Sequence, residues 1–204
     1  MPYPVAAVRG RFAGGAAGAG YLVYDTFTDT NATPLVSHTP DTAPVGSAWA
    51  WMFGTGLSIQ SNSLDCTGGT PSWANIDSGN ANVSVKAATM ILGTYVGLVA
   101  RGTGDVAENE GIMFHCQTTE DAYALFANQG AYTEIASAAA TLTPGDVVTN
   151  AELNVNGTAI EFLIDGVSKV SATSSVWLTQ TQIGIHGYNE NGTADWDDLT
   201  VTAL

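Results

Sequence analysis

The stretch Leu153-Asn-Val-Asn-Gly-Thr-Ala-Ile-Glu-Phe-Leu-Ile-Asp-Gly166 decides the fold. Apolar and polar residues alternate on both sides of its Asn-Gly pair, which is a favoured two-residue hairpin turn, and Asp165-Gly166 makes a second turn. Because strand side chains point alternately to two faces, the pattern predicts a three-stranded meander over 148–172 with one buried face. The side chains expected between two sheets are Leu153, Val155, Ile160, Phe162 and Ile164.

The rest of the chain, from Tyr21 onward, also consists of short runs rich in Val, Ile, Thr and aromatic residues, separated by Gly, Asn, Asp and Pro. No stretch has helical periodicity, and no repeat of fixed period favours a propeller or a solenoid. Further strands are predicted at 21–27, 49–53, 57–65, 81–90, 95–101, 111–117, 121–128, 131–137, 181–188 and 194–203. So many strands require two packed sheets or a closed barrel, and 204 residues suit one large β domain.

The charge of the chain is divided unevenly along its length. The net charge is −14, but residues 1–20 carry +2 and residues 21–204 carry −16, with three basic residues against 19 acidic ones. An acidic surface repels phosphate groups and anionic lipids, so no nucleic acid and no membrane is expected as a partner of the main domain. The favoured explanation of the acidic charge is solubility or a salty habitat. Binding of calcium or of a basic partner is the alternative explanation.

Residues 1–20 differ in composition from the β domain over 21–204, and we expect them to form a separate N-terminal arm. Two prolines favour extended backbone and the four glycines between residues 14 and 20 supply flexibility, so a disordered tail and a docking arm are both compatible with the segment. The residues expected to anchor a docking arm on a neighbouring subunit are Tyr3, Val5, Val8, Arg9, Arg11 and Phe12. The segment lacks the pattern of a secretory signal, which favours assembly from the cytoplasm, as in a phage particle.

Cys66 and Cys116 are the two cysteines of the chain, which is too few for a disulfide framework. One disulfide and two buried free thiols are both compatible with the sequence. Free thiols are favoured, because Cys116 lies in an apolar-alternating run over 112–116 and would point into the core.

Six segments of the chain carry a resemblance to a known superfamily. They are Tyr24–Asp29, Gly56–Leu64, Tyr95–Arg101, Asp121–Phe126, Leu153–Gly166 and Ala194–Val201. In the same order, they resemble strands of the concanavalin A-like lectin/glucanase superfamily, especially its laminin-G-like bacterial and phage members. The resemblance implies an all-β, two-sheet antiparallel jelly-roll sandwich with an extended N-terminal arm. It does not select a function, because this fold occurs in sugar binders, hydrolases and structural virion modules.

A structural calcium ion is one implication of the resemblance, since many of these sandwiches bind Ca²⁺ where the first and last strands meet. Asp25 and Asp29 lie near the first predicted strand, and Asp195 and Asp197 lie near the last. Carboxylates are ligands that calcium prefers. These four residues are the candidate ligands, and ordinary acidic turn residues are the alternative.

Catalysis is not expected. Hydrolases of this superfamily carry a Glu-x-Asp-x-(x)-Glu motif, and a retaining glycosidase needs two carboxyl groups about 5–5.5 Å apart. The chain lacks the motif, and its nearest candidate is Glu108-Asn-Glu110 in a glycine-rich loop. His38, His115 and His186 have no ligand-like spacing, and His115 is expected to be a satisfied or surface side chain.

Exposed aromatic rings are the expected means of sugar binding, because they stack on the apolar faces of pyranose rings. Trp73 follows a Gly-Gly-Thr-Pro sequence and Trp177 follows a Ser-rich turn, so these two are predicted to be exposed. The other candidates are Trp49, Trp51 and Tyr188. Core packing is the alternative for most of them, and Trp196 occupies the place of the superfamily's core aromatic residue.

The first hypothesis for function is a non-catalytic lectin-like module of a phage virion or another extracellular assembly. The arm would anchor it to neighbouring subunits, and the acidic sandwich would face cell-surface polysaccharide. The alternatives are a stand-alone carbohydrate-binding protein, a laminarinase-like glycoside hydrolase and a purely structural capsid or tail cement protein. The expected location is a virion or extracellular surface, in a homo-oligomer or a larger assembly.

Overall fold

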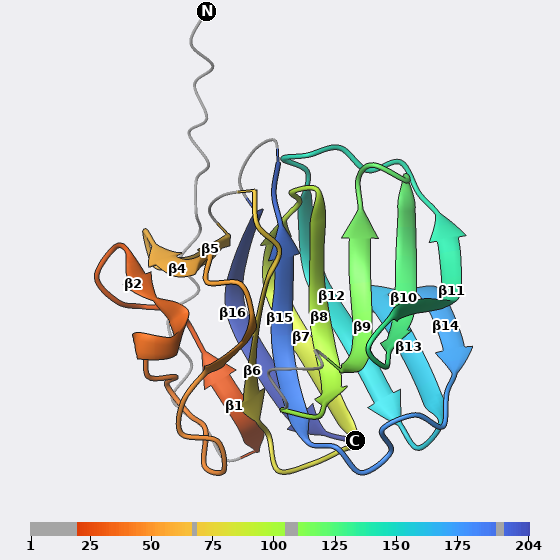
Figure 1. Cartoon of the computed structure of the whole chain (residues 1–204), viewed down its shortest axis with the longest axis horizontal. Coiled ribbons are helices and arrows are strands. Elements are labelled where there is room, and N and C mark those ends of the chain that lie inside the picture. Colours follow the sequence, from red (N-terminus) through yellow and green to blue (C-terminus); the bar gives the residue numbers. More distant parts are fainter. Residues whose placement is uncertain (1–19, 67–68, 105–109, 191–193) are drawn as a thin grey trace, which may run out of the picture.

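The computed structural model describes residues 20–66, 69–104, 110–190 and 194–204. It contains two antiparallel sheets that pack face to face, so the predicted all-β sandwich is confirmed (Figure 1). The predicted arm lies outside the described residues, except for Gly20. In the described ranges, no helix has the length and hydropathy needed to cross a membrane.

The two sheets account for every strand of the described chain. The nine-stranded sheet consists, in spatial order, of β14 (Val167–Thr173), β13 (Ala159–Ile164), β12 (Val147–Asn156), β7 (Val83–Ile91), β16 (Ala194–Ala203), β5 (Ser63–Cys66), β4 (Leu57–Gln60) and β2 (Thr33–Pro34), with β1 (Tyr21–Asp25) also paired to β16. The seven-stranded sheet consists of β11 (Tyr132–Ala139), β10 (Ala122–Asn128), β9 (Gly111–Gln117), β8 (Tyr95–Gly102), β15 (Gln182–Tyr188), β6 (Ser72–Asp77) and β3 (Ala50–Phe53). One turn of 3₁₀ helix, η1 (Leu35–Ser37), follows β2.

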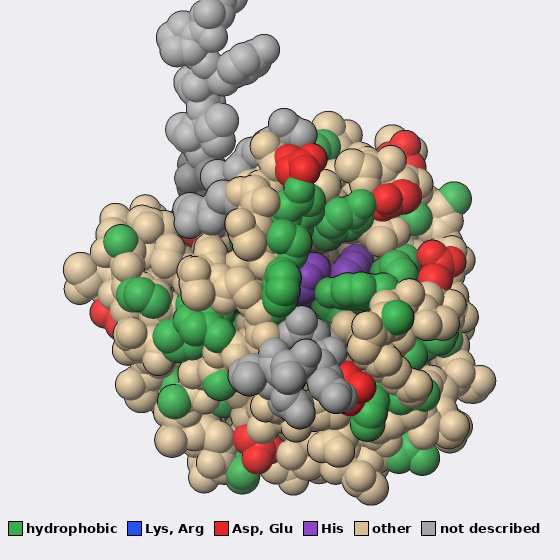
Figure 2. Space-filling view, viewed as in Figure 1, with side chains coloured by type: hydrophobic (Ala, Val, Ile, Leu, Met, Phe, Trp, Pro, Cys, Tyr) green, Lys and Arg blue, Asp and Glu red, His purple; other side chains and the backbone are tan. Residues whose placement is uncertain are grey.

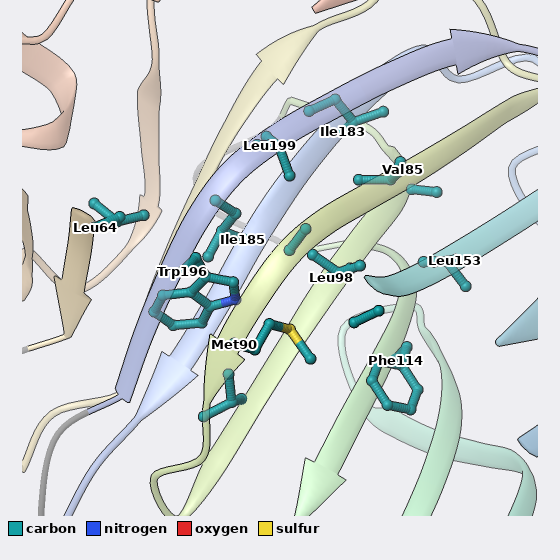
Figure 3. Close-up of a cluster of buried hydrophobic side chains, with 14 of the residues drawn as sticks. Leu64, Val85, Met90, Leu98, Phe114, Leu153, Ile183, Ile185, Trp196 and Leu199 are labelled. Carbon is teal, nitrogen blue, oxygen red and sulfur yellow. The ribbon is translucent and has the colours of Figure 1, made fainter. Parts of the chain in front are cut away.

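The hydrophobic core fills the space between the sheets. Trp196 and Met90 of the nine-stranded sheet belong to the same core cluster as Leu98 and Ile185 of the seven-stranded sheet. All four side chains are fully buried (Figure 3). The rings of Phe114 and Phe162 stack across the two sheets. Alternating residues of β12 and β13 supply this layer as predicted, although Ile164 is only half-buried. Period-two burial is therefore what holds the sandwich together.

The predicted meander is present, with one of its two turns displaced by one residue. β12 pairs with β13 through Leu153 opposite Phe162, and β13 pairs with β14 through Phe162 opposite Val170. The second turn falls at Asp165-Gly166 as predicted, where Gly166 has φ +73°, but the first turn is Gly157-Thr158 and not Asn156-Gly157, because Asn156 pairs with Ala159 and Gly157 has φ +54°. Glycine adopts this left-handed backbone region without the steric cost that other residues incur, so the two glycines fix the register.

Two strand predictions were wrong. The segment 57–65 was predicted as one strand, but it is the hairpin β4–β5, because Ser61 and Asn62 both take positive φ angles and reverse the chain. No strand was predicted between 65 and 81, but Ser72–Asp77 forms β6, which pairs with both β15 and β3. The strand was missed because β6 lies inside the sheet. Neighbouring strands on both sides supply its hydrogen bonds, and the local sequence does not reveal those neighbours.

The cysteines are free thiols, as the sequence favoured. Cys66 and Cys116 are both buried and unbridged. Burial raises the pKa of the Cys66 thiol to about 12 and raises the pKa of Cys116 as well. Both side chains therefore behave as small apolar groups of the core.

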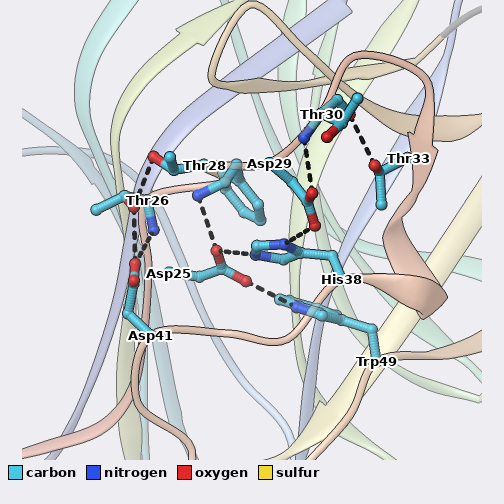
Figure 4. Close-up of polar contacts among 10 residues, drawn as sticks. Asp25, Thr26, Thr28, Asp29, Thr30, Thr33, His38, Asp41 and Trp49 are labelled. Carbon is cyan, nitrogen blue, oxygen red and sulfur yellow. Dashed lines mark hydrogen bonds and ion pairs between the residues drawn. The ribbon is translucent and has the colours of Figure 1, made fainter.

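The segment before β3 is attached to the sandwich by a buried polar network around Asp25 (Figure 4). One carboxylate oxygen of Asp25 accepts hydrogen bonds from the Phe27 backbone N–H at 2.8 Å and from Nε2 of His38 at 2.8 Å. The other oxygen accepts from Nε1 of Trp49 at 2.9 Å. Nδ1 of His38 lies 3.2 Å from an oxygen of Asp29. The network links β1 to η1 and to the start of β3, and it leaves no acceptor of Asp25 free for solvent.

Candidate functional site

The outer face of the seven-stranded sheet contains a hollow with a volume of about 460 Å³. Figure 2 looks directly onto this face and shows the histidine side chains at the bottom of the hollow, with hydrophobic side chains on either side. The described residues that line it come from five strands and one loop. They are Pro71, Tyr95, His115, Gln117, Phe126, Tyr132, His186 and Tyr188.

Two stacked imidazole rings form the floor of the hollow. His115 on β9 and His186 on β15 are both paired with Gly97 on β8, so one strand separates them. Their ring centroids are nevertheless only 4.6 Å apart, with 17° between the ring planes. Gly97 makes this possible, because a Cβ atom there would collide with the Phe114 carbonyl oxygen and the His115 ring. The missing side chain on the central strand therefore lets the two rings close over it.

Aromatic rings form two walls of the hollow. On one side Tyr95 of β8 stacks on Tyr188 of β15, with ring centroids 5.9 Å apart and an interplanar angle of 17°. On the other side Phe126 of β10 meets Tyr132 of β11 edge to face at 6.1 Å. His115 contacts both walls, since its ring lies 6.2 Å from Tyr95 and 5.2 Å from Phe126. The walls and floor therefore form one continuous aromatic surface.

Carboxylates hold the tyrosine wall in place at the edge of the hollow. The hydroxyl of Tyr95 donates a hydrogen bond to Glu120 at 2.9 Å, and the hydroxyl of Tyr188 donates one to Glu190. Thr119 in turn donates to the Tyr95 hydroxyl at 3.2 Å. The hydrogen bond to Glu190 raises the pKa of Tyr188, so its phenol stays protonated and keeps donating.

The histidine floor is uncharged at physiological pH. Burial lowers the pKa of His186 to about 4, and burial together with the neighbouring His186 lowers the pKa of His115 well below its ordinary value of 6.5. Nε2 of His115 and Nδ1 of His186 are buried and make no hydrogen bond within the described part of the chain. A charge on either ring would lack a compensating partner there, which is why the neutral forms are favoured.

Trp73 supports the floor from the side and is not an exposed sugar platform, so that prediction was wrong. It is fully buried on β6, its indole meets the His186 ring edge to face at 6.4 Å, and its Nε1 donates to Asn75. Met52, Val99 and Met113 surround it in a second apolar cluster on this face. Trp73 therefore positions His186 instead of contacting solvent.

The other aromatic candidates are spread over the molecule. Trp49 is buried in the core, and Trp51 is half-buried against it, so the core-packing alternative holds for both. Trp177 is half-buried, and its Nε1 donates to the Asn128 carbonyl at 3.3 Å, outside the lining of the hollow. Tyr188 is the one candidate that the structure places in the wall. Trp196 is fully buried in the core, as expected.

The four candidate calcium ligands do not form one site. The carboxylate oxygens of Asp25 and Asp29 are occupied by N–H donors and by His38. Asp25 pairs with Leu199 on β16, so Asp195 lies four residues further along that strand, beside Asp65 of β5. Within the described ranges, no group of three or more His, Cys, Asp or Glu residues is arranged to hold a metal ion. The predicted set therefore does not fit a calcium ion.

Sequence reasoning missed most of the hollow. His115 was expected to be satisfied or on the surface, but it lies in the floor with an unpaired nitrogen. Tyr95, Gln117 and Phe126 were counted only as strand residues. The available signal was the period of two: His115 and Gln117 share the face opposite Phe114 and Cys116, which occupy the core. Apolar or aromatic residues on both faces of a strand indicate that the outer face is also covered or binds something.

Comparisons with known proteins give structural relatives only. No protein-family model matches the chain, and no curated protein matches it. The carbohydrate-binding module CBM66 from Bacillus subtilis is 14% identical, with 76% of this chain and 95% of that chain covered and a TM-score of 0.64. The exoplasmic/lumenal domain of VIP36, in a Ca²⁺/Man3GlcNAc-bound form, is 12% identical, with coverages of 76% and 83% and a TM-score of 0.53.

A third relative comes from a study of endo-acting O-glycanases that prominent members of the human gut microbiota express to initiate mucin breakdown. It is 11% identical, with 90% of this chain and 99% of that chain covered and a TM-score of 0.52. At these identities the similarity concerns the fold. The chain therefore has the concanavalin A-like, galectin-like jelly-roll fold that the six sequence segments predicted.

Proposed function

We propose that this protein is a non-catalytic carbohydrate-binding module whose ligand occupies the hollow on the seven-stranded sheet. The observation that carries the proposal is the aromatic lining, with a tyrosine pair and a Phe-Tyr pair facing each other across two neutral imidazole rings. The apolar face of a sugar ring stacks on such surfaces, and a few polar groups then orient it. Gln117 and the hydroxyl of Tyr132 are such groups in the lining.

The size of the hollow supports the same proposal. A volume of about 460 Å³ lies within the range of roughly 300–1,000 Å³ that is usual for small-ligand sites. The carbohydrate-binding relatives CBM66 and VIP36 share the fold, which adds support to a sugar as the ligand class. Their names state what those proteins bind, and the particular glycan of this chain is a matter for experiment.

Binding is proposed in preference to hydrolysis because of the chemistry of the lining. The described lining residues are aromatic rings, imidazoles, an amide and a proline, and the two carboxylates at the edge, Glu120 and Glu190, each accept a hydrogen bond from a tyrosine of the same wall. A retaining glycosidase needs an acid and a nucleophile, both carboxyl groups, about 5–5.5 Å apart on either side of the scissile bond. Glu108 of the nearest motif lies outside the described residues.

The substitution Tyr188→Ala is expected to weaken glycan binding about tenfold, because it removes half of the tyrosine wall. The measurement is screening of the full chain against immobilised polysaccharides, followed by calorimetric titration of the best ligand. Tyr21→Ala is the matched control, since Tyr21 is an exposed aromatic residue of β1 on the other sheet. Equal affinities of the two variants for the glycan would contradict the proposal that the hollow is the sugar-binding site.

We further propose that the module is displayed on a virion or another extracellular assembly and is anchored through residues 1–20. The support is the charge division, with +2 in this segment and −16 in the rest of the chain, because a basic arm suits an acidic neighbouring subunit. Removal of residues 1–20 is expected to abolish assembly in gel filtration of the chain with candidate partner subunits, while glycan binding is retained. Assembly that survives the deletion would argue against the anchor.

A further inference from the structure

The charged side chains that the structure describes around the hollow are all acidic. Glu120 and Glu190 are exposed, and each accepts a hydrogen bond from one tyrosine of the wall. Both carboxylates act electrostatically on Tyr95, so both lie close to the same ring. Carboxylates in this position are acceptors for the hydroxyl groups of a sugar stacked on the tyrosine wall, and they repel an anion placed there.

The described chain offers no positive charge to balance them on this face. Its basic residues are Lys86 on β7, Lys169 on β14 and Arg101 at the end of β8. The two lysines belong to the nine-stranded sheet, and Arg101 is buried, with Nε donating to the Ala81 carbonyl and Nη2 to Asn82. Among the described residues, Figure 2 shows acidic side chains around the hollow and no lysine or arginine.

The floor adds no positive charge either. His115 and His186 lie face to face and are almost completely enclosed, so a proton on one ring would meet the other ring and no carboxylate in the lining. Recognition of a uronate, a sialic acid, a sulfate or a phosphate needs at least one cation or a cluster of N–H donors at the site. The described lining residues include no cation, and the amide of Gln117 is their one side-chain N–H group outside the enclosed imidazole rings.

We propose that the hollow selects uncharged sugars, with Glu120 and Glu190 as specificity-determining acceptors that bind hydroxyl groups and exclude acidic glycans. This inference rests on the proposed function, because it names the class of sugar bound at the same site. The hollow should therefore not bind cell-surface glycans whose terminal residues carry carboxylate, sulfate or phosphate groups.

The test compares neutral oligosaccharides with their C6-oxidised partners, which differ only by a carboxylate. Glucan, mannan and galactan oligosaccharides are paired with polyglucuronate, polymannuronate and polygalacturonate oligosaccharides in calorimetric titrations of the full chain. Binding of at least one neutral oligosaccharide, with its oxidised partner weaker by about tenfold or more, is the expected result. The difference should shrink as salt is added, since exposed charges are screened.

Glu120→Gln and Glu190→Gln test the two carboxylates directly, because an amide oxygen still accepts the tyrosine hydrogen bond. Each variant is expected to bind the neutral oligosaccharide about fivefold more weakly than the unsubstituted chain does. The ratio of its affinities for the neutral and the oxidised oligosaccharide should also decrease. Glu161→Gln on β13 of the other sheet makes the same change in net charge and should leave both affinities as in the unsubstituted chain.

The outcomes separate this inference from the proposed function. Neutral and oxidised oligosaccharides that bind equally well, with Tyr188→Ala weakening both, would overturn the selection of neutral sugars and leave the sugar site standing. Variants at Glu120 and Glu190 that match Glu161→Gln would overturn the role of the two carboxylates. No binding to any of the six oligosaccharides, or binding indifferent to Tyr188→Ala, would overturn the site itself.

Discussion

Asp25→Ala is expected to lower the free energy of unfolding by about 3–5 kcal/mol, the usual cost of breaking a buried charged network by removing one partner. Asp25 is fully buried and accepts hydrogen bonds from Phe27, His38 and Trp49. Its removal leaves the Trp49 indole N–H and the Phe27 backbone N–H without an acceptor, and it leaves His38 with Asp29 alone. The measurement is urea unfolding monitored by tryptophan fluorescence, from which the midpoint and the slope of the transition are obtained.

Asp41→Ala is the matched control for this experiment. Asp41 is an exposed carboxylate of the same segment and accepts hydrogen bonds from the backbone N–H and the hydroxyl of Thr26 at 2.8 and 2.7 Å. Because water replaces a lost partner at an exposed site, we expect a cost of about 1 kcal/mol. Similar losses in the two variants would mean that the buried network contributes no more to stability than a surface hydrogen bond.

Acid is expected to destabilise the protein through the histidine floor. Between pH 6.5 and about 4 the unfolded chain binds a proton at His186 and the folded chain does not, so the free energy of unfolding falls as the pH falls. His186 alone accounts for about 3 kcal/mol across this window. Its enclosed neighbour His115 acts in the same direction. The measurement is urea unfolding at a series of pH values from 7.5 to 4.

His186→Phe keeps a ring against His115 and Trp73 and removes the titrating group, so its stability should depend less steeply on pH in this window. His38→Gln is the control with the opposite sign. The hydrogen bond to Asp25 raises the pKa of His38, so its contribution is complete below pH 6.5 and is lost only as the pH rises through the raised value. A pH dependence of His186→Phe as steep as that of the unsubstituted chain would contradict the lowered pKa, because it would mean that His186 takes up its proton at the same pH in the folded and unfolded chains.

The strands of the sandwich could be predicted largely from local patterns. The segment 111–117 was predicted with the bounds that β9 has, and the Asp165-Gly166 turn of the meander fell where the sequence placed it, while the first turn lies one residue later than predicted. The errors at β4–β5 and β6 have different origins. Ser61 and Asn62 are residue types that favour turns, so the hairpin β4–β5 was within reach of the local pattern and was overlooked. Trp73 follows a Gly-Gly-Thr-Pro sequence typical of a loop, and pairing with β15 and β3 decided the conformation of β6.

The candidate site could be predicted only in part. Tyr188 was one of the further aromatic candidates and does line the hollow, whereas Trp73 was predicted to be exposed and is buried beside His186. A single strand reveals which residues share a face, but it does not reveal which strand will lie next to it. The partners of His115 therefore could not be read from the run 111–117.

The sequence by itself determined the two-layer β architecture, the three strands of the meander and their buried face, the free thiols and the acidic charge of the domain, because each depends on composition or on residues close together in the chain. Only the tertiary structure decided the hollow, in which His186 reaches His115 across Gly97 although 71 positions separate the two histidines. The physical reason is that sheet order and the empty space above one glycine set this contact, and neither is encoded in any local pattern.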